Sequence, residues 1–173
     1  MIGETGTPSS GTKKQEPTAL LAVDVGLKSG LAEYSLQGRL LRYRSCSFGN
    51  RRHLRRGVFA VMGDLPALEL LVLEGGGALA DVWRREAGRR GVEVRMVSAE
   101  NWREVLLYQR HRRGSRVAKR RAVELARRVI HDAAIRKPVS SLRHDAAEAI
   151  LTGLWAVLDI GWRRSLPPQL ERN

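Results

Sequence analysis

Cysteine is almost missing from this chain of 173 residues, which contains Cys46 and no other. One thiol cannot form an internal disulfide, and it leaves no cysteine-based zinc site. No apolar run is long enough to cross a membrane, and the first residues lack the basic and apolar regions of a signal peptide. With 43% hydrophobic residues, the chain can bury a core. We therefore expect one soluble globular domain in a reducing, intracellular compartment.

Acidic residues are also few in comparison with basic residues. The chain has 18 Asp and Glu against 31 Lys and Arg, which gives a formal net charge of +13. Such an excess attracts a polyanion, and nucleic acid is the natural candidate. A ribosomal-type or membrane-surface protein would carry the same charge, but neither explains why several of the few acids follow apolar strands.

Four of these acids stand where a predicted element ends or begins. Asp24 closes the apolar segment 20–24, and Glu74 closes the apolar segment 70–74. Both segments are typical of buried strands, so the two carboxylates converge if the strands are neighbours. Asp145 and Glu148 open an apolar helix, and their spacing of three puts them on one face. Four hard oxygen ligands in one place indicate a Mg²⁺ or Mn²⁺ site.

The pattern of apolar and turn residues predicts an α/β domain over residues 18–160, between a disordered tail at 1–17 and a C-terminal extension at 161–173. Three antiparallel strands come first, and helices and strands then alternate, which predicts a mixed sheet flanked by helices. The expected strands cover 20–24, 29–35, 40–48, 68–74 and 92–97. The expected helices cover 51–62, 78–87 with Gly88 as the stop, 98–107, 117–130 and 145–158.

Two basic segments are candidates for binding the phosphate backbone of a nucleic acid. The first is a stripe on one helix, and the second is a loop that leads into a helix, where Lys119 is the cation we expect nearest the reacting phosphate. A solvated helix face is the plainer interpretation of the first. The segments comprise Arg51, Arg52, Arg55 and Arg56, and then Arg110, Arg112, Arg113, Arg116, Lys119, Arg120 and Arg121.

The three acidic motifs together resemble those of the RuvC-type Holliday-junction resolvases, within the ribonuclease H-like superfamily. They read LAVDVGLKSG around Asp24, LVLE up to Glu74 and HDAAEAIL from His144. The resemblance covers roughly residues 18–155 and implies a five-stranded sheet whose second strand is antiparallel to the rest. It also implies a metal-dependent endonuclease that cuts branched DNA, above all four-way junctions, as a homodimer.

The same resemblance implies roles for individual residues. Asp24 would bridge two Mg²⁺ or Mn²⁺ ions, Glu74 would hold one of them, and Asp145 with Glu148 would complete the site from the helix. Gly26 would let the backbone approach the phosphate, and Gly30 would permit a tight turn into the second strand. Each acid also has a plainer interpretation, as a turn residue, a flexible rim or a helix cap.

His144 precedes the acidic helix pair and is a candidate proton shuttle or member of the metal shell, although a surface histidine is the plainer interpretation. Two features depart from the family. Glu148 stands where Asp is more usual, and residues 75–77 are glycines where many resolvases carry an aromatic wedge. Trp83 follows one turn later, and we expect it in the core rather than as a wedge.

Two other functions stay open at this point. One is a ribonuclease H-fold enzyme that acts on an RNA/DNA hybrid or a structured RNA, and the other is a non-catalytic basic scaffold that binds nucleic acid. A DNA substrate would place the protein in the cytoplasm or on the nucleoid. The sequence leaves open whether a bacterium, an organelle or a phage encodes it.

Overall fold

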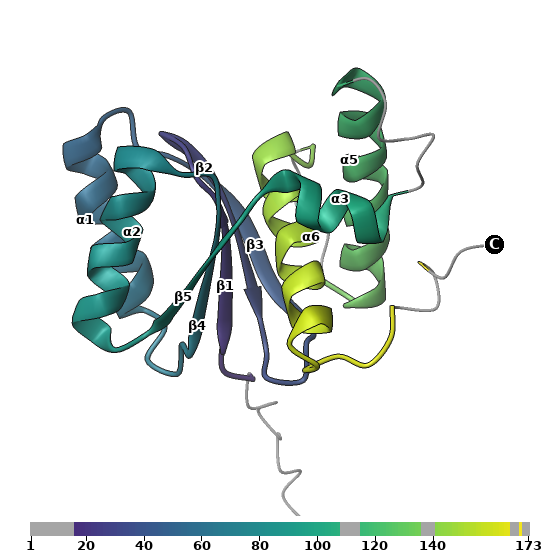
Figure 1. Ribbon diagram of the computed structural model, residues 1–173, viewed down its shortest axis with the longest axis horizontal. Helices are drawn as coiled ribbons and strands as arrows, with labels where there is room; N and C mark the ends of the chain where they lie inside the picture. The colour runs from purple at the N-terminus through teal and green to yellow at the C-terminus, as the bar shows by residue number, and fades with distance from the viewer. Residues whose placement is uncertain (1–15, 108–114, 136–140, 167–169, 171–173) are drawn as a thin grey trace, which may run out of the picture.

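A five-stranded mixed sheet forms the centre of the computed structural model, which describes residues 16–107, 115–135, 141–166 and 170 (Figure 1). The strand order is β3-β2-β1-β4-β5. β2 runs antiparallel to both of its neighbours, whereas β1 with β4 and β4 with β5 are parallel. This arrangement confirms the expected fold class. The strands are β1 (Leu20–Asp24), β2 (Lys28–Tyr34), β3 (Leu40–Ser47), β4 (Leu70–Glu74) and β5 (Glu93–Val97).

Helices cover both faces of the sheet (Figure 1). Alternate residues of β1 point to opposite faces, so Leu21 and Val23 pack under α1 and α2, whereas Leu20 and Ala22 pack under α6. α6 lies directly on β1 and β2, and α3 and α5 pack against it. The helices are α1 (Arg51–Gly63), α2 (Gly77–Arg90), α3 (Ala99–Leu106), α5 (Ser115–Asp132) and α6 (His144–Asp159).

The expected end of one helix is wrong. α2 continues through Gly88 to Arg90 and ends at Gly91, which has a φ of 69° and donates its backbone N–H to the last carbonyls. A glycine inside a helix is tolerated, and the left-handed conformation that terminates a helix is adopted at the second glycine instead. The other elements begin and end within about two residues of the expected positions.

Trp83 is fully buried in the core beneath α1 and α2, as expected. The glycines after β4 include Gly75 and Gly77, whose φ values of 105° and 69° disfavour any larger residue. An aromatic side chain at either of these two positions would therefore strain the backbone. Most of the expected tail, residues 1–15, lies outside the described residues.

Beyond α6, Trp162, Leu166 and Leu170 pack against the core. Within the described ranges, no helix has the length and apolar character that a membrane span requires.

Candidate active site

The two strand-end carboxylates are direct neighbours in the sheet. β1 and β4 run in parallel, and their register pairs Asp24 with Glu74. Adjacent strands lie about 4.8 Å apart, so both carboxylates lie side by side where the parallel strands end. We call this end of the strands the acidic edge of the sheet. The convergence expected from the sequence is therefore present.

Glu74 is buried and held in a fixed orientation. Its side chain accepts a hydrogen bond from Trp102 Nε1 at 2.9 Å and another from Thr152 Oγ1 at 2.6 Å, both on Oε2. Burial raises the pKa of Glu74, while the hydrogen bonds from Thr152 and Trp102 oppose the rise. The donors stabilise the charged form and leave Oε1 without a hydrogen bond from any described residue.

Asp24 carries the least compensated charge of the site. Burial raises the pKa of its carboxyl to about 7, and the negative charges of Glu148, Glu74 and Asp145 contribute to the rise. Within the described parts of the chain, neither oxygen of Asp24 has a hydrogen bond or an ion pair. The negative charges of Glu74, Asp145 and Glu148 all act on Asp24, so the four carboxylates form a cluster that a divalent cation would stabilise.

The first turn of α6 brings Asp145 to this edge. Its Oδ1 accepts a hydrogen bond from Ser45 Oγ at 2.5 Å and one from the backbone N–H of Ala146 at 2.8 Å. Arg143 Nε lies 4.0 Å from the same oxygen. As in Glu74, all of these contacts are made by one carboxylate oxygen, and Oδ2 accepts no hydrogen bond from a described residue.

Gly30 permits this approach, although not in the way expected. It lies inside β2 and pairs with Asp24, so it does not form the turn into the strand. A Cβ placed on Gly30 would be 1.8 Å from the backbone carbonyl oxygen of Asp145. Only glycine therefore lets the start of α6 lie against the strand beside Asp24.

Substitution of Gly30 by Ala is expected to destabilise the fold by roughly 1–3 kcal/mol or more, because backbone atoms must move apart. It should also weaken cleavage, since Asp145 and Glu148 move with α6. Chemical denaturation and a nuclease assay measure the two effects. The matched control is Gly88→Ala, which meets no atom within 4 Å in α2 and should be neutral or stabilising. Equal stability and activity of Gly30→Ala and wild type would contradict the packing argument.

Glu148 also presents one engaged oxygen and one free oxygen. Its Oε1 accepts a hydrogen bond from Arg103 at 3.0 Å and lies 3.5 Å from His144 Nε2, whereas no described residue bonds to Oε2. His144 Nε2 is buried without a hydrogen-bond partner among the described residues. His144 thus lies within the acidic cluster, and its role as a shuttle stays a prediction.

The basic segments are only partly described. Arg51, Arg52, Arg55 and Arg56 are exposed in the first turns of α1. Lys119, Arg120 and Arg121 are exposed on α5, where Arg121 pairs with Glu124. Arg110, Arg112 and Arg113 lie outside the described residues, as does the side chain of Arg116. Phosphate binding by either segment stays a prediction.

Four residues that position the carboxylates were not predicted from the sequence. Thr152 follows Glu148 by one helical turn, so its polar side chain on the same face of an apolar helix was a usable signal. Trp102 is fully buried, but its hydrogen bond to Glu74 depends on how α3 packs. Ser45 and Arg103 come from β3 and α3, and no local pattern marks their contacts with Asp145 and Glu148.

The carboxylate oxygens are suitable ligands for a hard divalent cation, although they are not arranged as a complete coordination site. As the side chains stand, no three His, Cys, Asp or Glu residues of the described ranges are placed to hold an ion. Among the described residues, three carboxylates nevertheless have one oxygen fixed by hydrogen bonds and one oxygen that accepts none, and neither oxygen of Asp24 accepts one. Oxygen ligands of this type bind Mg²⁺ and Mn²⁺.

No protein-family model and no curated protein sequence matches the chain. Among solved structures, RuvC of T. thermophilus in complex with a Holliday junction substrate is similar, with a TM-score of 0.59 and 15% identity over 82% of this chain and 94% of that chain. A second structure of Thermus thermophilus RuvC has a TM-score of 0.58 and 15% identity over 82% and 96% of the two chains.

A third similar structure comes from a virus. It is the Fowlpox virus resolvase in complex with Holliday junction DNA, with a TM-score of 0.57 and 13% identity over 82% of this chain and 97% of that chain. These likenesses agree with the observed five-stranded mixed sheet flanked by helices. The chain therefore has the ribonuclease H-like fold of RuvC and of the poxvirus resolvase.

Proposed function

We propose that this protein is a divalent-metal-dependent endonuclease that resolves branched DNA, with four-way junctions as its substrate. The observation that carries the proposal is the acidic cluster at one edge of the sheet. There, Asp24 lies among three other carboxylates without a cationic partner in the described chain. A cluster of this kind is costly unless a cation binds to it.

Asp24, Glu74, Asp145 and Glu148 would hold Mg²⁺ or Mn²⁺. When bound, two such ions supply an activated water and stabilise the leaving oxygen of a phosphodiester. The protein's own contribution is orientation. Trp102 and Thr152 fix Glu74, and Ser45 and Arg103 fix Asp145 and Glu148 in the same way. In each of these carboxylates, the oxygen that accepts no hydrogen bond from a described residue would be the one that holds a metal ion.

Branched DNA is favoured as the substrate by two observations. The net charge of +13 attracts nucleic acid, and two of the similar solved structures contain Holliday junction DNA. Such an enzyme would work in DNA recombination and repair, in the cytoplasm or on the nucleoid, and a phage is a compatible source. Paired symmetrical cuts need two sites, so we also propose a two-fold homodimer.

A substrate panel tests the proposal. Purified protein would be incubated with a labelled four-way junction, a matching linear duplex and an RNA/DNA hybrid, each with Mg²⁺, with Mn²⁺ and with chelator. Paired nicks in the junction alone, lost in chelator, are expected. Cleavage of the hybrid alone would indicate a ribonuclease instead. Binding without cleavage under every condition would indicate a scaffold.

Divalent metal binding should depend on pH in a defined direction. The pKa of Asp24 is about 7 in the metal-free protein, so a proton competes with the metal below that pH. Affinity for Mn²⁺ should rise up to about tenfold per pH unit below pH 7 and level off above it. Calorimetric titration at pH 6, 7 and 8 measures this trend. An affinity that does not change with pH would contradict the assignment of Asp24 as a ligand.

A further inference from the structure

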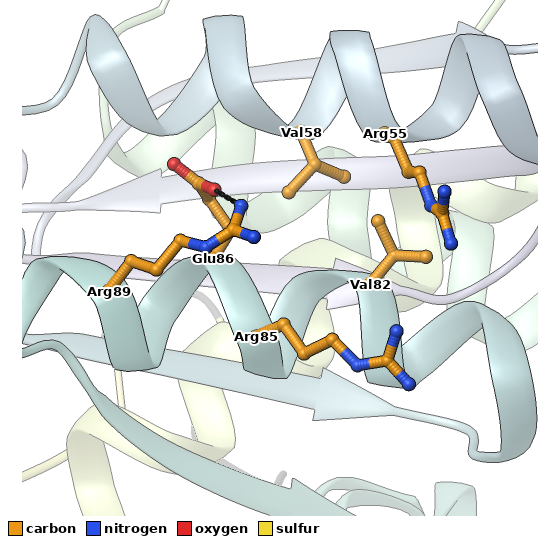
Figure 2. A pocket seen from close by; sticks show the side chains of 6 residues that line it. All are labelled: Arg55, Val58, Val82, Arg85, Glu86 and Arg89. Carbon is orange, nitrogen blue, oxygen red and sulfur yellow. Dashed lines mark hydrogen bonds and ion pairs between the residues drawn. The ribbon is translucent and has the colours of Figure 1, made fainter.

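A basic groove lies between α1 and α2, on the face of the sheet opposite α6 (Figures 1 and 2). Its volume is about 240 Å³. Figure 2 shows Val58 of α1 and Val82 of α2 facing each other between the helices, with Arg55 and Arg85 directed to one end of the groove. The lining residues are Arg55, Val58, Val82, Arg85, Glu86 and Arg89.

The groove carries more positive charge than its own acid can neutralise. Arg55 and Arg85 have no ion-pair or hydrogen-bond partner among the described residues. Glu86 is the acid of the lining, and it binds Arg90 at 2.7 Å as well as Arg89 at 3.3 Å. Its single charge is therefore shared by two arginines, and the two others stay uncompensated. An anionic occupant would complete the groove.

The residues exposed on this surface disfavour a second copy of the chain as the occupant of the groove. The larger apolar residues of both helices, including Met62 and Trp83, are buried against the sheet. Phe59 is 63% exposed, but Arg90 lies over its ring at 5.3 Å. A two-fold contact through α1 and α2 would thus bring arginines of like charge together, at a cost in free energy.

The groove also has a defined place relative to the acidic cluster. β3 leads into α1 at the edge that carries Asp24, since Ser47 pairs with Lys28 at the start of β2, and β4 ends in Glu74 just before α2. Both helices therefore begin at the acidic edge and run away from it. Arg55 is in the second turn of α1, and Arg89 is in the last turn of α2. The groove leads outward from the site.

We propose that the α1–α2 groove binds the phosphate backbone of a duplex DNA arm that extends from the acidic site. The inference rests on the proposed function and adds a second contact surface to it. Guanidinium groups suit this ligand because they form paired hydrogen bonds with phosphate oxygens. The two valines form an apolar floor, and Glu86 holds Arg89 at the groove. Contacts of this kind hold the arm without reading its sequence.

The test compares two double variants with equal loss of charge. Arg55→Gln with Arg85→Gln removes the uncompensated groove arginines. Arg39→Gln with Arg164→Gln removes two exposed arginines that lie after β2 and after α6, at the edge of the sheet away from Asp24. Fluorescence anisotropy with chelator present then gives the affinity of the full chain for a four-way junction and for a linear duplex over a series of salt concentrations.

We expect the groove variant to lose about tenfold or more in affinity for both DNAs, and its slope of log affinity against log salt to fall by about two, one for each lost phosphate contact. The control variant should keep the wild-type slope. An unchanged affinity of the groove variant, or an equal loss in both variants, would overturn the proposal. Thermal unfolding should match wild type, since both arginines are exposed.

This binding measurement separates the two proposals. Because chelator is present, the result does not depend on cleavage. A groove variant with normal affinity, in a protein that cuts junctions, would refute the groove alone. A protein that shows the expected loss but cuts no substrate with any metal would refute the proposed function alone.

Discussion

Substitution of Asp24 by Asn is expected to abolish cleavage and, in the metal-free protein, to raise the thermal stability. Cleavage should fall by at least about 10³-fold, because loss of a ligand charge removes about 4 kcal/mol or more of transition-state stabilisation. DNA binding should persist, since the basic surfaces are unchanged. A single-turnover nuclease assay with labelled junction measures the first effect.

The gain in thermal stability follows from the rise in the pKa of Asp24 when the protein folds. The pKa of its carboxyl is about 7 in the folded protein, whereas the ordinary value of 3.8 applies to the unfolded chain. Between these values the folded state binds more protons, so the free energy of unfolding decreases as pH rises. Above pH 7 the ionised carboxylate imposes its full cost. Asparagine removes that cost, so the variant should melt at a higher temperature than wild type at pH 8 in chelator, and about equally at pH 4.

Added Mn²⁺ gives the complementary result. It should raise the melting temperature of wild type, because a ligand that binds the folded state stabilises it, and should have little effect on the Asp24→Asn variant. Asp64→Asn, at an exposed position after α1, is the matched control and should behave like wild type. Retained cleavage by Asp24→Asn, or a lower melting temperature in chelator, would refute the assignment.

Glu74→Gln is expected to have the second large effect. Glutamine keeps an oxygen that can accept the hydrogen bonds from Trp102 and Thr152, so the fold should remain stable. It lacks the negative charge, so cleavage should again fall by about 10³-fold. Circular dichroism and the junction assay measure the two properties. Normal cleavage by this variant would show that Glu74 is not a ligand.

Comparison of Glu74→Ala with Glu74→Gln separates the effect of the hydrogen bonds to Glu74 from the effect of its charge. Alanine leaves Trp102 Nε1 and Thr152 Oγ1 buried without an acceptor, and each unsatisfied donor costs about 1–3 kcal/mol. The alanine variant should therefore be both inactive and clearly less stable than Glu74→Gln. If the two variants were equally stable, the hydrogen bonds to Glu74 would not be holding the site as described.

Much of the fold could be predicted from local sequence patterns. Continuous apolar residues before Asp24 and Glu74 identify buried strands, and the alternation of helices and strands after residue 50 implies parallel pairing. Parallel neighbours end at the same edge, so the convergence of the two acids followed from topology. The helix acids could be placed on one face from their spacing alone.

The rest depends on contacts between segments that are distant in the sequence. Ser45 reaches Asp145 across 100 residues, and Trp102 reaches Glu74 across 28. The role of Gly30 was misassigned because its neighbour is the backbone of α6, which no local pattern reveals. The groove between α1 and α2 likewise exists only after Arg55 and Arg85 are brought side by side.

Crystallography of the wild-type protein with Mn²⁺, using anomalous scattering to locate the ion, tests directly whether the acidic cluster binds metal. If these acids hold the metal, anomalous peaks should contact the carboxylates of Asp24 and Glu74, on the oxygens that accept no hydrogen bond from the described residues, and no such peaks should appear in Asp24→Asn. A Mn²⁺-saturated crystal without a peak beside Asp24 and Glu74 would show that these carboxylates are not metal ligands.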